Sequence, residues 1–195
     1  AMSSLLSSSE LEVWMTEGLA IAKQAVRSWE AASEFFRVSP IVFRGQPFVP
    51  MLDWARWGGA LSQASPSMAT AYFRASAEAI AFVEPDQIPS WASLGKGLYK
   101  GSWKSASLAV RFFETSPSLL KNLSLPDLSH FVGIIDVLSN RSYDVAVECL
   151  GLGVDTFPRL KGYHSEFISL LGTLSESNWR EVKGTFESGA RAIPK

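Results

Sequence analysis

Aromatic residues recur along the chain at a long and nearly constant interval. Successive members are separated by 40, 37, 40 and 36 residues, and the series is Trp14, Trp54, Trp91, Phe131 and Phe167. We call these the anchor residues. Most positions three residues before, four after and seven after an anchor hold an apolar residue or a glycine. Because this spacing follows one face of an α-helix, the pattern predicts five helices, each with an anchor on its apolar face.

A second series of bulky residues follows each anchor by 19 or 22 residues: Phe36, Phe73, Phe113, Leu150 and Phe186. The residue four positions earlier is alanine in the first four copies and Val182 in the fifth. Large and small residues that alternate on one face favour close helix packing. The series therefore predicts a second helix in each unit, and the longer distance in the first and third units indicates an insertion of nearly one helical turn.

A short third helix is expected at the end of each unit. Apolar residues stand seven positions beyond the second series, at Phe43, Ile80, Leu120, Phe157 and Ile193. Ser39-Pro40 and Ser116-Pro117 precede two of them, and serine followed by proline is typical of a helix start.

These patterns together predict an all-α fold, a right-handed α-solenoid of the armadillo or HEAT kind. We expect a single domain over residues 1–195, with units at 11–50, 51–87, 88–127, 128–163 and 164–195. An irregular helical bundle without repeats is the alternative. The fifth unit stops at Ile193-Pro194-Lys195, midway through its expected third helix, so we expect the native protein to continue or a partner to cover this end.

Composition narrows the classes of protein that fit. Apolar residues make up 47% of the chain and charged residues 19%, with a net charge of −1 and no run of Lys or Arg. This balance disfavours a nucleic-acid binder. No apolar stretch approaches the roughly 20 residues that cross a bilayer. One cysteine and no recognisable secretion signal predict a cytoplasmic protein.

Residues that could carry chemistry are few. Cys149 occupies a position held by Phe35, Tyr72 and Phe112 in other units, which favours a small core residue. His130 falls on a polar face, and His164 replaces an apolar residue. Gly95-Lys96-Gly97 lies inside an expected helix rather than in a phosphate-binding loop. We therefore predict no catalytic residue, no cofactor and no metal site.

Two surface features are candidates for interactions. Arg56 and Trp57 stand beside the anchor Trp54, and an exposed tryptophan next to an arginine is typical of an interface hot spot. The alternative is that Trp57 packs against a neighbouring helix. Arg74 and Glu114 follow the second series in successive units, which predicts an exposed ion pair between them.

The repeat unit reads Trp-x3-Gly-x2-Leu, then Ala-x2-(Phe/Tyr)-Phe, then Ser-Pro, and the stretch from Trp91 to Leu120 shows it best. This resembles the helical repeats that precede the von Willebrand factor A domain in bacterial proteins related to nitric-oxide-reductase activation factors. The resemblance implies an adaptor or chaperone-like role beside such a domain, often with an AAA-type ATPase. The Asp-x-Ser-x-Ser metal motif of the A domain is missing here, so no metal site carries over.

The function expected from these observations is a non-enzymatic interaction scaffold or adaptor, part of a larger protein, that binds another protein or an adjacent domain. The alternative is a DNA-binding or DNA-repair enzyme on a HEAT-like scaffold. A small apolar ligand held between helices is a third possibility.

Overall fold

The computed structural model describes residues 2, 5–44 and 48–192, and these form ten α-helices and no strands. The odd-numbered helices are α1 (Ser8–Ala22), α3 (Phe48–Ala64), α5 (Ile88–Leu98), α7 (Leu125–Arg141) and α9 (His164–Ser177). The even-numbered helices are α2 (Ser28–Val42), α4 (Pro66–Ala79), α6 (Trp103–Leu120), α8 (Tyr143–Thr156) and α10 (Trp179–Ala192). Two short 3-10 helices, η2 (Pro85–Gln87) and η3 (Phe157–Arg159), follow α4 and α8. The all-α prediction is confirmed.

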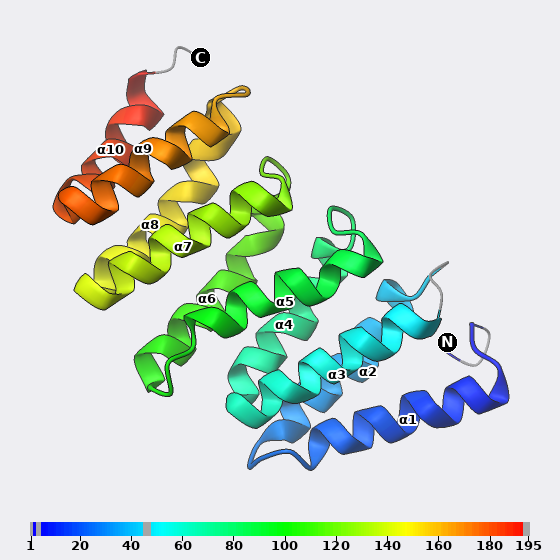
Figure 1. Cartoon of the computed structure of the whole chain (residues 1–195). Helices are drawn as coiled ribbons and strands as arrows, with labels where there is room; N and C mark the ends of the chain where they lie inside the picture. Colours follow the sequence, from blue (N-terminus) through cyan, green and yellow to red (C-terminus); the bar gives the residue numbers. More distant parts are fainter. Residues whose placement is uncertain (1, 3–4, 45–47, 193–195) are drawn as a thin grey trace. The chain divides into compact units, whose positions relative to one another are not determined.

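The contacts between Cα atoms divide the chain into two compact units, residues 1–114 and 115–195. In the first unit, α1, α3 and α5 lie side by side in one layer, while α2 and α4 pack behind them (Figure 1). In the second unit, α7 pairs with α9 and α8 pairs with α10 in the same manner (Figure 1). The boundary falls inside α6, and the expectation of a single five-unit domain stays a prediction.

Each anchor lies in an odd-numbered helix, and each member of the second series lies in an even-numbered helix, as the spacing predicted. Glycines on α1, α3 and α5 leave room for the rings of the second series on α2, α4 and α6. A Cβ atom built on Gly18 would lie 2.1 Å from Cζ of Phe36, and one on Gly58 would lie 1.8 Å from Cζ of Phe73. Only glycine allows this approach, so these residues set the distance between the two helices of a pair.

Polar bonds inside the core follow the same repeat. The indole N–H of Trp14 donates to Ser39 Oγ at 3.0 Å, and that of Trp54 donates to Ser76 Oγ at 2.8 Å. Each serine hydroxyl in turn donates to the backbone carbonyl four residues earlier in its own helix. Ser116 follows Trp91 by the same 25 residues that separate Ser39 from Trp14.

Where the anchor is phenylalanine, glycine replaces this serine. Gly153 and Gly189 stand 22 residues after Phe131 and Phe167. A Cβ atom on either glycine would lie 3.0 Å from a ring carbon of its anchor. The serine is therefore present in the units whose anchor is a tryptophan, because the buried indole N–H needs an acceptor. It is replaced by glycine in the units whose anchor is a phenylalanine, where the ring of the anchor occupies the space.

Among the described residues, the expected third helix is wrong for the first and third units, whereas the short 3-10 helices η2 and η3 follow α4 and α8 in the second and fourth units. Phe43 and Ile80 cap the ends of α2 and α4, Leu120 ends α6, and Phe157 begins a 3-10 turn. Pro40 and Pro117 lie inside the last turns of α2 and α6, so each helix continues past its proline with one helical hydrogen bond fewer. Ser39 is therefore a core residue rather than an N-cap. Ile193 and the rest of the expected end of the fifth unit lie outside the described residues.

The insertion in the first and third units lengthens the connection between the two helices of a pair. Residues 23–27 join α1 to α2, and residues 99–102 join α5 to α6. The other pairs are joined by one residue each, namely Ser65, Ser142 and Asn178. Ser142 also caps α8, because its side chain accepts a hydrogen bond from the N–H of Val145.

Candidate functional site

The predicted pair Arg56 and Trp57 lies on α3. The Arg56 side chain is 63% exposed and pairs with Asp53 at 3.6 Å in the same helix. Trp57 is half-buried, and Nζ of Lys96 on α5 lies 5.6 Å from its ring centroid. This cation–π contact holds Trp57 against a neighbouring helix and leaves part of the ring accessible. A role of these two residues in binding a partner stays a prediction.

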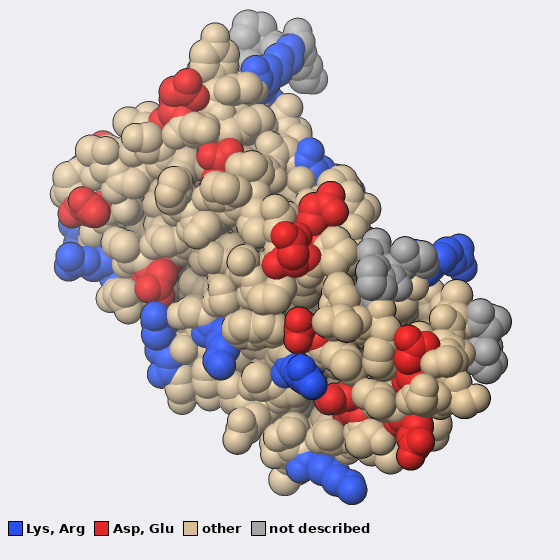
Figure 2. Space-filling model, turned by 45° about the vertical axis from the view of Figure 1, so that its right-hand side comes forward, with Lys and Arg blue, Asp and Glu red and all other residues tan. Residues whose placement is uncertain are grey.

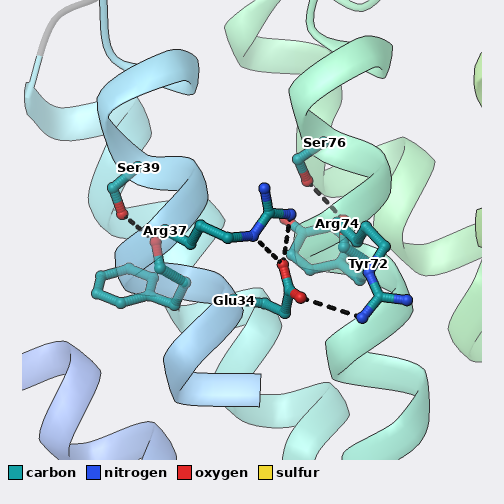
Figure 3. A network of polar contacts seen from close by, with 7 residues as sticks. Glu34, Arg37, Ser39, Tyr72, Arg74 and Ser76 are labelled. Atoms are coloured by element: carbon teal, nitrogen blue, oxygen red, sulfur yellow. Dashed lines mark hydrogen bonds and ion pairs between the residues drawn. The ribbon is translucent and has the colours of Figure 1, made fainter. Parts of the chain in front are cut away.

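A second polar cluster joins α2 to α4 (Figure 3). Glu34 accepts two hydrogen bonds from Arg37, at 2.6 and 2.8 Å, and one from Arg74 of α4, at 3.0 Å. Burial alone would raise the pKa of Glu34, but the hydrogen bonds and charges of the two arginines outweigh it, and the pKa lies below its ordinary value.

The expected ion pair between Arg74 and Glu114 is wrong, because Arg74 binds Glu34 and Glu114 pairs with Arg111 at 3.6 Å. Both arginines of the Glu34 cluster are more than half exposed, at 57% and 61% of their side chains. The cluster thus resembles an ordinary ionic bridge between helices rather than a reactive site.

The cysteine and the histidines lie where the repeat placed them. Cys149 is fully buried, and burial is the main cause that raises the pKa of its thiol to about 12. A reactive thiol would need exposure and a lowered pKa, so Cys149 is a core residue as predicted. His130 is exposed, and His164 is half-buried with Nε2 2.9 Å from the carbonyl of Phe157.

The described residues contain no cluster of three or more His, Cys, Asp or Glu side chains that could hold a metal ion. A void beside Trp54, Ser76 and Trp91 encloses about 10 Å³. That space is large enough for one water molecule at most, so it does not fit a small organic ligand.

A concave surface that the sequence did not indicate is an open groove between α7 and α9. It has a volume of about 570 Å³, and all of its lining comes from these two helices. Gly133 and Gly172 leave room along the groove, and Ile134 and Ile168 form an apolar floor. One further apolar residue, four serines, a histidine and a glutamate complete the lining: Val137, Ser129, Ser165, Ser169, Ser175, His130 and Glu176.

Small residues create this groove. A Cβ atom on Gly133 would meet no heavy atom within 4 Å, unlike one on Gly18 or Gly58. Ser165 at the start of α9 donates a hydrogen bond to Asp127 at the start of α7, at 3.0 Å, which fixes one end of the groove. The groove therefore combines an apolar floor with a polar rim on two helices tied together.

Basic and acidic side chains occur together on the surface that Figure 2 draws. Figure 2 shows Lys and Arg side chains interspersed with Asp and Glu on the face drawn, without a continuous basic band over the described residues. No described helix combines the length and apolar character needed to cross a membrane.

No protein-family model matches the chain, and no curated protein or solved structure matches it either.

Proposed function

We propose that the chain is a cytoplasmic, non-enzymatic protein-interaction scaffold, part of a larger protein. Its helix pairs stack as a right-handed α-solenoid of the armadillo or HEAT kind, and the groove between α7 and α9 binds a segment of another protein or of an adjacent domain. A von Willebrand factor A domain is the neighbour that the sequence resemblance suggests.

The groove is the observation that carries this proposal. Its apolar floor and serine-rich rim fit a segment that buries an apolar face and leaves polar edges in water, such as an amphipathic helix. The glycines let the backbone of a bound helix come close to α7 and α9. The lining residues include neither Lys nor Arg, so nothing in the groove favours the alternative of a DNA-repair enzyme.

The proposal can be tested with a substitution that fills the groove and leaves the core unchanged. Gly133→Arg places a long side chain into open space, so we expect the variant to fold and to lose the proteins that the wild-type chain captures. Gly184→Arg is the matched control, because Gly184 is an exposed helical glycine of α10 with open space around it.

The readout is pull-down followed by mass spectrometry, with circular dichroism to check folding. We expect the same partners for the wild type and for Gly184→Arg, and their loss for Gly133→Arg. Capture that is equal for all three proteins would exclude the groove as the binding site. Tight binding of duplex DNA in a gel-shift titration at low salt would favour the enzyme alternative.

A further inference from the structure

The first helix exposes apolar side chains on the side opposite its neighbour α3. Met15 and Leu19 are 50% and 55% exposed and stand one turn apart on the same face. Ile21, in contrast, is 1% exposed and points toward α3, where a Cβ atom on Gly59 would lie 3.8 Å from it. The exposed face of α1 is therefore the side on which no described helix packs.

The equivalent positions of the later odd-numbered helices are buried. The residues that correspond to Met15 are 1%, 0%, 5% and 3% exposed, namely Ala55, Ala92, Val132 and Ile168. The positions that correspond to Leu19 include Gly59, which faces Ile21 of α1, and Gly172, whose Cβ atom would lie 3.9 Å from Ile134 of α7. In both compact units this face thus packs against an odd-numbered helix of the same chain. An α-helix of the same kind is therefore what fits the exposed face of α1.

The charges at the ends of this face make it complementary to itself. Glu12 and Lys23 are 11 residues apart, which places them on one side of the helix with Met15 and Leu19 between them. Both are exposed, and neither forms an ion pair with another described residue. If two copies of α1 lie antiparallel about a two-fold axis that crosses the exposed face at the level of Glu17, Glu12 faces Lys23 of the other copy, and Met15 faces Leu19.

We propose that two copies of this chain associate through α1 in this antiparallel, two-fold arrangement. A head-to-tail contact would place this face against α9 or α10 of the next copy, and it is disfavoured because it leaves an unpaired end on every assembly. In addition, α10 carries Arg180, Glu181, Lys183 and Glu187, and has Thr185 where α2, α4 and α6 have a ring. A two-fold contact instead buries apolar against apolar residues and closes after two copies. It involves neither α7 nor α9, so it is independent of the proposed function.

The first test is the mass in solution as a function of concentration, by sedimentation velocity. We expect the wild type to pass from monomer to dimer as its concentration rises, and Met15→Glu/Leu19→Glu to stay monomeric. Val49→Glu is the matched control, because Val49 is 68% exposed at the start of α3 and lies off this face. A wild-type chain that stays monomeric, or a dimer that the double variant retains, would overturn the proposal.

The charges test the orientation. We expect Glu12→Lys and Lys23→Glu each to raise the dimer dissociation constant about tenfold at low salt, since each change creates two repulsive contacts. The combination Glu12→Lys/Lys23→Glu restores two attractive contacts and should return the constant close to the wild-type value. A combined variant that is as weak as the single variants would exclude the antiparallel pairing.

Discussion

At the residue scale, the buried tryptophan anchors show how one polar atom constrains its surroundings. Trp54 is 0% exposed, and its N–H has an acceptor only because Ser76 stands one helix away. Phe131 has no N–H, and Gly153 stands where Ser76 would be. The choice of anchor and the choice of its partner are therefore coupled through the cost of a buried unpaired donor.

This coupling predicts a non-additive pair of substitutions. Ser76→Ala leaves the indole N–H of Trp54 without an acceptor, so we expect the free energy of unfolding to fall by about 1–3 kcal/mol. In a Trp54→Phe background no donor remains, and the same serine substitution should cost at least about 1 kcal/mol less. Urea denaturation of the four proteins measures the difference. Strictly additive effects would contradict the coupling.

At the scale of the helices, the positions of the apolar residues were enough to predict the elements. The anchors and the second series predicted which stretches form odd- and even-numbered helices, because burial of one face imposes the helical period. Ser39-Pro40 misled the prediction of a third helix, since the sequence alone does not show that Ser39 accepts a hydrogen bond from Trp14, 25 residues away.

The groove could not be predicted for a related reason. Gly95 and Gly133 are both helical glycines, yet a Cβ atom on Gly95 would lie 2.2 Å from Phe113, whereas one on Gly133 would meet nothing within 4 Å. The sequence shows the small residue in each case. Only the structure shows whether a ring or open space lies opposite, so Arg56 and Trp57 were the candidates that the sequence offered.

The packing of α5 against α6 predicts opposite effects for two neighbouring glycines. Gly95→Ala forces its Cβ atom into the ring of Phe113, and we expect the free energy of unfolding to fall by about 2–3 kcal/mol. Gly97→Ala adds a methyl group in open space on the same helix and should raise it by about 0.5–1 kcal/mol. Thermal or urea unfolding measures both.

A second variant separates this clash from other effects of alanine. Phe113→Leu removes the ring atoms that the new methyl group would meet, so Gly95→Ala should cost less in that background. If Gly95→Ala proves as harmless as Gly97→Ala, the close approach of the two helices is wrong.

At the scale of the whole molecule, buried groups that resist ionisation connect stability to pH. Burial raises the pKa of Cys149 to about 12 and the pKa of Tyr72 well above its ordinary value. In the unfolded chain the thiol ionises near pH 8.5. Above that pH the unfolded state has lost a proton that the folded state keeps, so stability decreases as the pH rises.

We expect the free energy of unfolding to fall by about 1.4 kcal/mol per pH unit through the range above about pH 8.5, with Tyr72 adding to the slope above about pH 10. Guanidinium unfolding at a series of pH values measures this slope. Cys149→Ala should remove it between about pH 8.5 and pH 10. An equal slope in the wild type and in this variant would show that other groups cause it.

Side-chain hydrogen bonds between helices join residues that are near in the sequence, such as those 22, 25, 38 and 40 positions apart. Three of the helix pairs are closed by a single connecting residue. Short loops of this kind lose little entropy on closure, and proteins rich in such nearby pairings fold fast. The N-terminal helix pairs can therefore form on the ribosome while the C-terminal helices are still being translated.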